Sequence, residues 1–507
     1  MSSYYYITSP IYYVNDVPHI GHAYTSIACD VMARFMRLSG KNVKFLTGTD
    51  EHGQKVEKSA ELKNQDPQKF VDEVSQRFRD LSSLLNLSND DFIRTSEERH
   101  KLGATALWNK LLEKEYIYLG KYSGWYSVRD ESFFLEKDLV DGKAPTGAPV
   151  EWVEESSYFF ALSKFQDKLL DFYQDNPDFI QPESRFNEVV SFVKSGLQDL
   201  SVSRTSFKWG IKVSQNPEHV MYVWLDALTN YISALGYPET TDLYKNFWPA
   251  DIHVVGKDIL RFHAVFWPAF LMAADLPCPK KIFAHGWWTI DGEKMSKSIG
   301  NVVAPQVLVE DFGLDQTRYF LMREIPFGQD GNFSRIAMQN RINGELANNI
   351  GNLAQRTLSF INKNAEGRVP LIDIDKLYKE ALLANIKEKI QDYHQNMNGQ
   401  KFNLALEAVI EIANTANGFI ETQAPWALRK TNPERMFEVL YMLIESIRYI
   451  AILLLPFMPD SMNKLLDFLA VDIERRKFSY LNQDFALSPG IELPAPSGIF
   501  PRINLDL

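Results

Sequence analysis

Hydrophobic and polar positions follow two different rhythms along the chain. In the first third, short runs rich in β-branched and aromatic residues, such as residues 4–10 (YYYITSP) and 43–51 (VKFLTGTDE), alternate with longer helical patterns, the first over residues 22–38. Strands that alternate with helices usually form a parallel sheet, because a parallel crossover needs a connection of helix length. This part of the sequence therefore predicts an α/β domain.

A change of pattern after Tyr116 divides the α/β region. Short strands and turns dominate the next hundred residues, and the alternation of strands and helices then returns. From about Leu346 onward, apolar residues recur at spacings of three and four, which is typical of helices packed in a bundle. We expect a sheet domain in two halves (1–115 and 217–298), an inserted lobe (116–216), a linker region (299–345) and a helical domain (346–507).

The most apolar late stretch, VLYMLIESIRYIAILLLPFMP from Val439, contains Glu445 and Arg448 three positions apart. This spacing favours a buried amphipathic helix over a membrane span. The first residues lack the basic or amphipathic character of a targeting leader, and the two cysteines, Cys29 and Cys278, form no CxxC pair. We therefore expect a cytoplasmic protein without disulfides and without a membrane association.

Charge restricts the partners that the chain can bind. The formal net charge is -11, with 45% hydrophobic and 23% charged residues over 507 positions. This composition is that of a folded protein with several domains. A surface that is basic throughout is excluded, but a local basic face for nucleic acid remains possible.

Two histidines follow the first predicted strand, in the stretch VNDVPHIGHAY. His19 and His22 lie where a helix is expected to begin, and Gly21 between them keeps the backbone approachable. A helix N-terminus presents backbone N–H groups and partial positive charge, and imidazoles there add further donors. The arrangement indicates a phosphate site; ordinary loop histidines are the alternative for this stretch taken alone.

A second candidate phosphate site lies in the stretch DGEKMSKSIGN. Lys294 and Lys297 flank Met295 and Ser296 in a loop bounded by glycines. Lysines on such a loop can close over a polyphosphate and neutralise the charge that develops during transfer, although a solvated surface turn is the alternative. The chain contains neither GxxxxGK[ST] nor GxGxxG. A nucleotide would therefore bind through a different motif.

Together, HIGH and KMSKS on either side of an interrupted α/β sheet resemble the motifs of the class I aminoacyl-tRNA synthetases. Over essentially its whole length the chain resembles the methionyl-tRNA synthetases of that class. The resemblance implies a Rossmann-like catalytic domain, an ATP–Mg²⁺ complex as substrate, and methionine and tRNA(Met) as the other substrates. The implied ATP contacts in the two motifs are His19, Gly21, His22, Lys294, Met295, Ser296 and Lys297, and the histidines and lysines among them are the implied catalytic residues.

The same resemblance implies a methionine pocket built from the segments SPIYYVN, LTGTDEHGQK, YVWLDALTNYI and VVGKDILRFHAVFWPAF. The implied contacts are Ile11, Tyr13, Asp50, Trp224, Ala227, Leu228, Tyr231, Ile259 and His263. These residue types suit the ligand, because aromatic faces receive a thioether well and the carboxylate of Asp50 can pair with the substrate ammonium. Leu228 stands where this family often has proline. Taken singly, each aromatic residue is equally well explained as part of the core.

Gly256, Lys257 and Asp258 lie at a probable strand end, where open α/β sheets bind ligands. The resemblance places these three residues near the adenosine of ATP. An ion pair between Lys257 and Asp258 is the alternative interpretation.

The predicted lobe departs from the family pattern. Many relatives carry cysteine pairs that bind zinc, whereas the matching segment, GWYSVRDESFFLEKDLVDGKAPTGAPVEW, has Ser127 and Asp130 near the first pair and contains no cysteine. Without thiolates a tetrahedral zinc site is improbable, so we predict a lobe without metal. Aromatic residues would hold it together, namely Trp125, Tyr126, Phe133 and Phe134.

Two segments of the helical region, NIGNLAQRTLSF and ETQAPWALRK, resemble those with which the family reads the anticodon. They imply contacts by Asn352, Arg356 and Trp426, residue types that suit splayed single-stranded bases. Residues 334–368 contain five basic and two acidic residues, a net charge of +3, which predicts a local basic patch. The alternative is an ordinary surface arginine beside a core tryptophan.

The predicted activity is the ligation of methionine to tRNA in two steps, through methionyl-adenylate. A synthetase for leucine, isoleucine, valine or cysteine is disfavoured by the chain length, by the lack of an editing domain and by the missing zinc cysteines. A tRNA-binding relative without catalysis is disfavoured by the intact motifs, and a simpler nucleotidylyltransferase by the helical region. The chain ends without the extra module of some longer relatives, so we expect a monomer.

Overall fold

The computed structural model describes residues 3–14, 17–129, 132–134, 136–290, 293–294 and 302–504. The chain forms two compact units. The sheet unit contains Ser2–Pro18 and Lys44–His285, and the helical unit contains His19–Val43 and Gly286–Leu507. The first long helix therefore belongs to the same unit as the C-terminal helices, although it lies between two strands of the sheet in the sequence.

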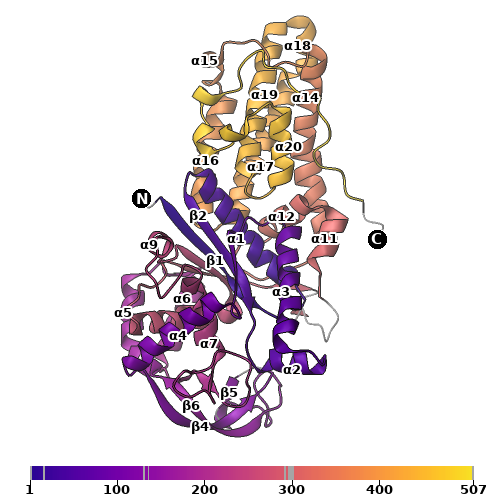
Figure 1. Ribbon diagram of the computed structural model, residues 1–507. Coiled ribbons are helices and arrows are strands. Elements are labelled where there is room, and N and C mark those ends of the chain that lie inside the picture. Colours follow the sequence, from indigo (N-terminus) through magenta and orange to yellow (C-terminus); the bar gives the residue numbers. More distant parts are fainter. Residues whose placement is uncertain are drawn as a thin grey trace. The chain divides into compact units, whose positions relative to one another are not determined.

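A six-stranded sheet in the order β3-β2-β1-β11-β12-β7 forms the centre of the sheet unit (Figure 1). Its strands are β1 (Tyr4–Tyr13), β2 (Asn42–Asp50), β3 (Asp91–Arg94), β7 (Ile180–Gln181), β11 (Ile252–Gly256) and β12 (Ile282–His285). The pairs β2–β3, β1–β11, β11–β12 and β12–β7 are parallel. This confirms the predicted parallel-sheet α/β fold.

Helices of the sheet unit pack their apolar sides on this sheet. Tyr6, Leu46 and Ile93 of three neighbouring strands share one buried core with Trp108 of α4 and Phe270 of α10. The helices are α2 (Gln54–Leu62), α3 (Pro67–Leu84), α4 (Glu98–Glu113), α5 (Gln166–Asp175), α6 (Glu183–Lys194), α7 (Val223–Leu228), α8 (Asn230–Ser233), α9 (Asp242–Phe247) and α10 (Trp267–Ala273). This core supports the strand ends at which the site is expected.

Antiparallel strands form the predicted lobe. In it β4 (Ile117–Ser127) pairs along its length with β6 (Glu151–Phe160), flanked by β5 (Ser132–Phe134) and β8 (Leu200–Ser201), while β9 (Ser203–Arg204) pairs with β10 (Val220–Met221). One feature differs from the simple picture of an insertion. β7 lies within 116–216 and yet forms an edge of the main sheet, so the chain returns to the sheet from inside that range. The predicted boundaries themselves stay a prediction.

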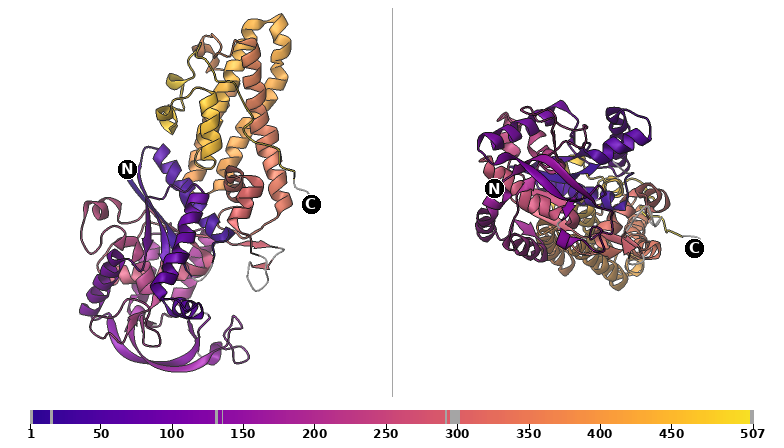
Figure 2. Two further views of the ribbon diagram at one scale, coloured as in Figure 1. Left: turned by 45° about the vertical axis from the view of Figure 1, so that its right-hand side comes forward. Right: turned by 90° about the horizontal axis from the view of Figure 1, so that it is seen from below.

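The helical unit confirms the predicted C-terminal bundle. Its helices are α1 (Ile20–Leu38), α11 (Pro305–Phe312), α12 (Leu314–Arg323), α13 (Arg335–Arg341), α14 (Asn352–Asn364), α15 (Ile374–Leu377), α16 (Ala381–Asn398), α17 (Phe402–Gln423), α18 (Pro425–Thr431), α19 (Pro433–Leu454) and α20 (Pro459–Phe468). A π-helical segment, Ile342–Gly351, leads into α14. The long helices α14, α16, α17 and α19 lie alongside one another, as Figure 1 and Figure 2 both show.

α19 is buried around its whole circumference from Val439 to Leu454. The two charged residues of this buried stretch are paired with each other, because Arg448 Nε donates to Glu445 at 3.0 Å. The hydroxyl of Tyr378 donates to the same carboxylate at 2.5 Å. The charged pair thus explains how this apolar segment lies inside a bundle. Among the described residues, no helix combines the length and the apolar character that crossing a bilayer requires.

An ion pair without solvent contact fixes α1 within the helical unit. Arg318 of α12 donates from Nη2 to Asp30 Oδ2 at 2.6 Å, and both side chains are fully buried. The same guanidinium donates to the carbonyl oxygens of Phe457 and Pro456, at 2.9 and 3.0 Å. The half-buried Arg34 adds a second cation to Asp30 at 2.7 Å. α1 is therefore attached both to α12 and to the turn after α19.

We predict that Asp30→Asn strongly destabilises the helical unit, because it leaves the buried guanidinium of Arg318 without a counter-charge. Loss of one partner of a buried ion pair costs about 3–5 kcal/mol. The shift of the urea unfolding midpoint measures this loss.

Asp311→Asn is the matched control, because it removes a carboxylate from the exposed pair Arg335–Asp311, which spans 2.5 Å. Such surface pairs contribute about 0–1 kcal/mol. Equal shifts for the two variants would contradict a special role of the buried pair.

Candidate active site

The predicted methionine contacts lie at one edge of the main sheet. β1 ends at Tyr13, β2 at Asp50 and β11 at Gly256. From β1 the chain continues to β2 and β3 on one side of the sheet, whereas from β11 it continues to β12 on the other side. The strand order therefore reverses between β1 and β11. In open α/β sheets, ligands bind outside the carboxyl ends of the strands at such a point. The predicted contacts therefore lie at the part of the sheet where this rule expects a ligand.

Most of the predicted pocket residues share one apolar core. Ile11, Trp224, Leu228, Tyr231 and Ile259 belong to it or pack against it. Tyr231 and Leu228 are buried, whereas Ile11, Trp224 and Ile259 are partly exposed. Residues from the first strand and from the region 224–259 thus belong to the same core.

Two other predicted contacts lie apart from this core. Tyr13 packs against a second cluster, formed by residues such as Tyr12 and Val14, and Lys55 lies over its ring with Nζ 5.8 Å from the centroid. Ala227 is buried, in α7 next to Leu228.

Phe262, which was not singled out from the sequence, lies directly against the predicted contact Trp224. Its ring stacks on the indole of Trp224, with centroids 3.3 Å apart and planes inclined by 13°. It begins a π-helical segment, Phe262–Phe266, that also contains His263. π-Helical turns are frequent at functional sites, but their sequence pattern hardly differs from that of an α-helix. The neighbouring position of His263 was the only signal for Phe262.

A chain of hydrogen bonds fixes the tautomer of His263, and burial determines its charge state. Its Nδ1 lies 2.9 Å from the carbonyl oxygen of Ile259, and its Nε2 lies 2.7 Å from the hydroxyl of Tyr231. A carbonyl only accepts, so Nδ1 carries the hydrogen and Nε2 accepts from Tyr231. Burial lowers the pKa of His263 to about 4, against smaller opposing effects of Ile259 and Asp258. The imidazole is therefore neutral at physiological pH.

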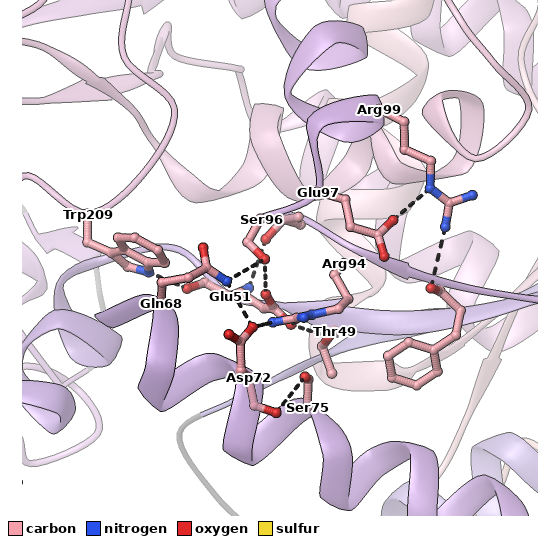
Figure 3. A network of polar contacts seen from close by, with 12 residues as sticks. Thr49, Glu51, Gln68, Asp72, Ser75, Arg94, Ser96, Glu97, Arg99 and Trp209 are labelled. Atoms are coloured by element: carbon pink, nitrogen blue, oxygen red, sulfur yellow. Dashed lines mark hydrogen bonds and ion pairs between the residues drawn. The ribbon is translucent and has the colours of Figure 1, made fainter. Parts of the chain in front are cut away.

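Asp50 is buried and is followed by a residue that anchors the backbone. Glu51 is fully buried, and its carboxylate accepts hydrogen bonds from Thr49 at 2.7 Å, from Arg94 Nε at 2.7 Å and from Ser96. The indole of Trp209 donates to the carbonyl oxygen of Glu51 at 2.6 Å. Figure 3 shows these donors around Glu51. Neither Glu51 nor Arg94 was singled out from the sequence, because their partners lie in four separate segments.

The predicted adenosine contacts follow β11 directly. Gly256 ends the strand, and Lys257 begins a short 3-10 turn that contains Asp258. A Cβ atom at Gly256 would lie 2.6 Å from Oδ1 of Asp258, so a larger residue would displace that side chain. Asp258 is exposed and Lys257 is partly exposed. The structure thus places these three residues together at the carboxyl edge of the sheet.

The two predicted phosphate histidines begin α1 in the helical unit. His19 caps the helix, with Nδ1 accepting from the backbone N–H of Gly21 at 3.0 Å, and Nδ1 of His22 accepts from the backbone N–H of His19 at 3.1 Å. The ring centroids are 3.9 Å apart. Burial and the neighbouring His19 lower the pKa of His22 well below its usual range. A neutral ring whose Nδ1 accepts carries its hydrogen on Nε2.

This geometry corrects one step of the sequence argument. The backbone N–H groups of the first turn were expected to bind phosphate directly. Instead, Gly21 N–H donates to His19, and Ile20 N–H donates to the carbonyl oxygen of Val303 at 3.0 Å. These two backbone groups are therefore already engaged within the protein, and the role of the imidazoles stays a prediction.

Residues on both sides of the lysine motif contact α1. Before the motif, β13 (Trp288–Ile290) pairs with β14 (Glu293–Lys294), and Trp288 packs edge-on against Tyr24 of α1 at 5.7 Å. After it, Val303 receives the hydrogen bond from Ile20. The side chain of Lys294 and all of Met295, Ser296 and Lys297 lie outside the described residues. The described residues on both sides of the motif, Trp288 and Val303, thus contact the helix that His19 caps.

Three predicted anticodon contacts lie close together in the helical unit. Asn352 is exposed and begins α14, one turn before Arg356. The guanidinium of Arg356 lies 5.6 Å from the ring centre of Trp426, and its Nη1 donates to Glu421 at 2.6 Å. Trp426 is 44% exposed, which disagrees with the alternative of a core tryptophan. Ala424, with φ of 44°, makes the left-handed turn that leads from α17 to α18.

The net charge of +3 counted for residues 334–368 does not describe the folded surface. Each of its four arginines is paired with a carboxylate: Arg335 with Asp311, Arg341 with Glu324 and Glu345, Arg356 with Glu421, and Arg368 with Glu492. Most of these acidic partners lie outside the segment. The predicted basic patch is therefore largely neutralised by neighbouring elements.

The described part of the lobe contains one ring contact of the predicted aromatic cluster, and its other members are paired through the backbone. Trp125 packs edge-on against Trp152 at 5.4 Å and pairs through its backbone with Phe134, while Tyr126 pairs with Phe133. Ser127 is buried, and Asp130 lies outside the described residues. Within the described ranges, no three or more His, Cys, Asp or Glu side chains are grouped to hold a metal ion. The absence of zinc stays a prediction.

Comparisons with known proteins cover the whole chain. The family described as tRNA synthetases class I (M) matches residues 5–148 and 137–358, and the anticodon binding domain of methionyl tRNA ligase matches residues 374–506. A methionine--tRNA ligase of Rickettsia felis is 60% identical over 511 residues, covering 100% of both chains. One of Brucella suis is 54% identical over 506 residues, covering 98% of both.

Solved structures agree with these matches. A Mycobacterium tuberculosis methionyl-tRNA synthetase in complex with methionyl-adenylate is similar with a TM-score of 0.94 and 49% identity, covering 99% of this chain and 100% of that chain. Its apo form is similar with a TM-score of 0.88 and 46% identity, covering 100% and 99%. The likeness extends over both units of the chain.

The lowered pKa of His263 predicts a pH-dependent contribution to stability. The unfolded chain, with an ordinary value of 6.5, binds this proton more readily than the folded chain does. Stability present above pH 6.5 is therefore lost as the pH falls toward about 4, by about 1.4 kcal/mol per unit. His263→Gln keeps an acceptor for Tyr231 but cannot titrate, so its melting temperature should fall less between pH 7 and pH 5. Parallel curves for the two proteins would contradict this assignment.

Proposed function

This chain belongs to the class I tRNA synthetases of the methionine type, and we propose that it is a methionine--tRNA ligase. It activates methionine with ATP to give methionyl-adenylate and pyrophosphate, and then transfers the methionyl group to the 3′ end of tRNA(Met). The observation that carries the proposal is the contact of both flanks of the lysine motif with α1, which begins at His19. That contact supports the proposal, because it holds the described flanks of the lysine motif against the helix that carries the two histidines.

The first step needs little acid–base chemistry from the protein. The methionine carboxylate is already ionised at neutral pH and attacks the α-phosphate of ATP, while pyrophosphate leaves. Catalysis is then mainly positioning and neutralisation of charge. In our proposal the Nε2–H groups of His19 and His22 bind the phosphates, and Lys294 and Lys297 stabilise the charge of the transition state and of the leaving pyrophosphate. Mg²⁺ enters with ATP as part of the substrate.

The selection of methionine follows from a pocket without a charged group at its apolar end. Asp50 binds the substrate ammonium, and the aromatic rings of Trp224 and Tyr231 receive the thioether, whose sulfur gains about 0.3–1.5 kcal/mol from such contacts. His263 supports the assignment of an uncharged pocket, because burial keeps its imidazole neutral. Both of its ring nitrogens have partners within the protein. An additional charge on the substrate side chain would remain unsatisfied there.

In the second step, a hydroxyl of the terminal ribose of the tRNA attacks the acyl carbon of the adenylate, and AMP leaves. We assign recognition of the anticodon to Asn352, Arg356 and Trp426. The exposure of Trp426 and the cation–π contact of Arg356 support this assignment. The proposal includes a cytoplasmic monomer whose lobe contains no zinc.

We expect pyrophosphate exchange that depends on methionine. The purified protein should incorporate labelled pyrophosphate into ATP with methionine, and with leucine, isoleucine, valine or cysteine at rates lower by roughly a hundredfold or more, because a small difference in a pocket discriminates by about 10–200-fold. Exchange with leucine and not with methionine would refute the assignment.

Substitution of Trp426 should separate the two steps. Trp426→Ala removes a stacking surface worth about 1–3 kcal/mol per base, which corresponds to about 5–150-fold in kcat/KM for tRNA charging. Methionine activation should not change. Phe485→Ala, at another exposed aromatic residue of the helical unit, is the control and should leave both rates unchanged. Equal losses of activation and charging in Trp426→Ala would contradict an anticodon role.

A further inference from the structure

A buried carboxylate that substrate binding does not use lies in α7, between two predicted methionine contacts. Asp226 is 1% exposed and follows Trp224 by two positions. Its Oδ2 accepts from Nδ1 of His52 at 2.7 Å, and its Oδ1 accepts from Nε2 of His100 at 2.8 Å. The two histidines come from the loop after β2 and from α4. Three separate elements of the sheet unit thus meet at one carboxylate.

The protonation of this cluster follows from its geometry. An ionised carboxylate only accepts hydrogen bonds, so both facing imidazole nitrogens carry hydrogens. Burial by itself raises the pKa of Asp226, but the charges and hydrogen bonds of His52 and His100 outweigh it and hold the pKa well below its usual range. The carboxylate is therefore ionised, and both of its oxygens are satisfied.

The cluster extends to a third pocket segment. Nδ1 of His100 lies 2.9 Å from the hydroxyl of Ser233 in α8. This gives an unbroken chain, His52–Asp226–His100–Ser233, buried from end to end. His52 lies two positions after Asp50, Asp226 two positions after Trp224, and Ser233 two positions after Tyr231. In each of the three segments, the residue that belongs to this chain of hydrogen bonds therefore lies two positions after a proposed methionine contact.

We infer that the His52–Asp226 pair is a positioning device for methionine, which sets the distance between the ammonium-binding Asp50 and the thioether-binding face of α7. This inference rests on the proposed function. Hydrogen bonds fix donor and acceptor within a narrow range of distance and angle, whereas apolar contacts tolerate sliding. A binding site needs its groups held within about 0.5 Å of the productive geometry.

A purely stabilising role of the cluster makes a different prediction. Removal of His52 would then lower the melting temperature without a specific effect on methionine. In a positioning role, the contact of Asp50 with the ammonium weakens in the ground state and the transition state alike, so KM rises while kcat changes little. The split between KM and kcat therefore separates the two roles.

The experiment measures methionine-dependent pyrophosphate exchange of the full-length protein and three substitutions. His52→Ala should raise KM for methionine by about tenfold or more, with kcat within about threefold and KM for ATP within about twofold of the wild-type values. His52→Asn places an amide donor near the position of Nδ1 and should bring KM for methionine back to within about threefold.

His219→Ala is the matched control. His219 is also buried in the sheet unit, at 3% exposure, and its Nδ1 lies 2.9 Å from the hydroxyl of Ser203 rather than from a residue of this chain of hydrogen bonds. Its loss removes a comparable side chain, so the melting temperature should fall while KM for methionine stays within about twofold.

Three results would overturn the inference: a rise of KM in His52→Ala no larger than in His219→Ala, a loss confined to kcat, or no recovery in His52→Asn. If His52→Ala does not fold, His52→Gln decides the question, because it carries the same amide one methylene further out. Its KM for methionine must then exceed that of His52→Asn. A wild-type protein without any methionine-dependent exchange would instead refute the proposed function.

Discussion

A carboxylate removed from water must be met by hydrogen-bond donors or by a cation, because its lost solvation is otherwise not replaced. Three buried carboxylates meet this requirement with partners from distant segments: Asp30 with Arg318, Glu51 with Arg94, and Asp226 with His52 and His100. Each lies in or beside a segment that carries proposed substrate contacts. The need to satisfy these charges fixes the position of those segments within their own units.

Apolar packing alone would hold the same segments at a smaller cost in desolvation. It does so for Trp108 and Phe270, which are fully buried in the core that also contains Tyr231. Beside the strand ends, the chain adds directional bonds to this packing. The hydrogen bonds that join Tyr231, His263 and Ile259 act in the same way, because they fix one tautomer of a neutral histidine among the predicted methionine contacts. Such networks fix the relative positions of side chains rather than increase the net stability of the fold.

Much of the fold follows from local pattern. The long amphipathic and apolar runs of α1, α17 and α19 are helices, and the branched runs of β1, β2 and β11 are neighbouring strands of one sheet. β7 was not predicted, because two residues are too few for a period to be recognised. Likewise, the sequence count for residues 334–368 gave a positive segment, but folding brings carboxylates such as Asp311 and Glu421 to its arginines.

The sequence by itself determined the order of the elements, the two phosphate motifs and the residue types of the pocket, since helix and strand periods act over a few neighbouring positions. Only the tertiary structure decided which groups are partners. His52 meets Asp226 across 174 positions, Trp224 stacks on Phe262, and the backbone N–H of Ile20 is taken by Val303. These pairings depend on the path of the chain through the sheet and the bundle. No local spacing encodes that path, because the partners become neighbours only when the core closes.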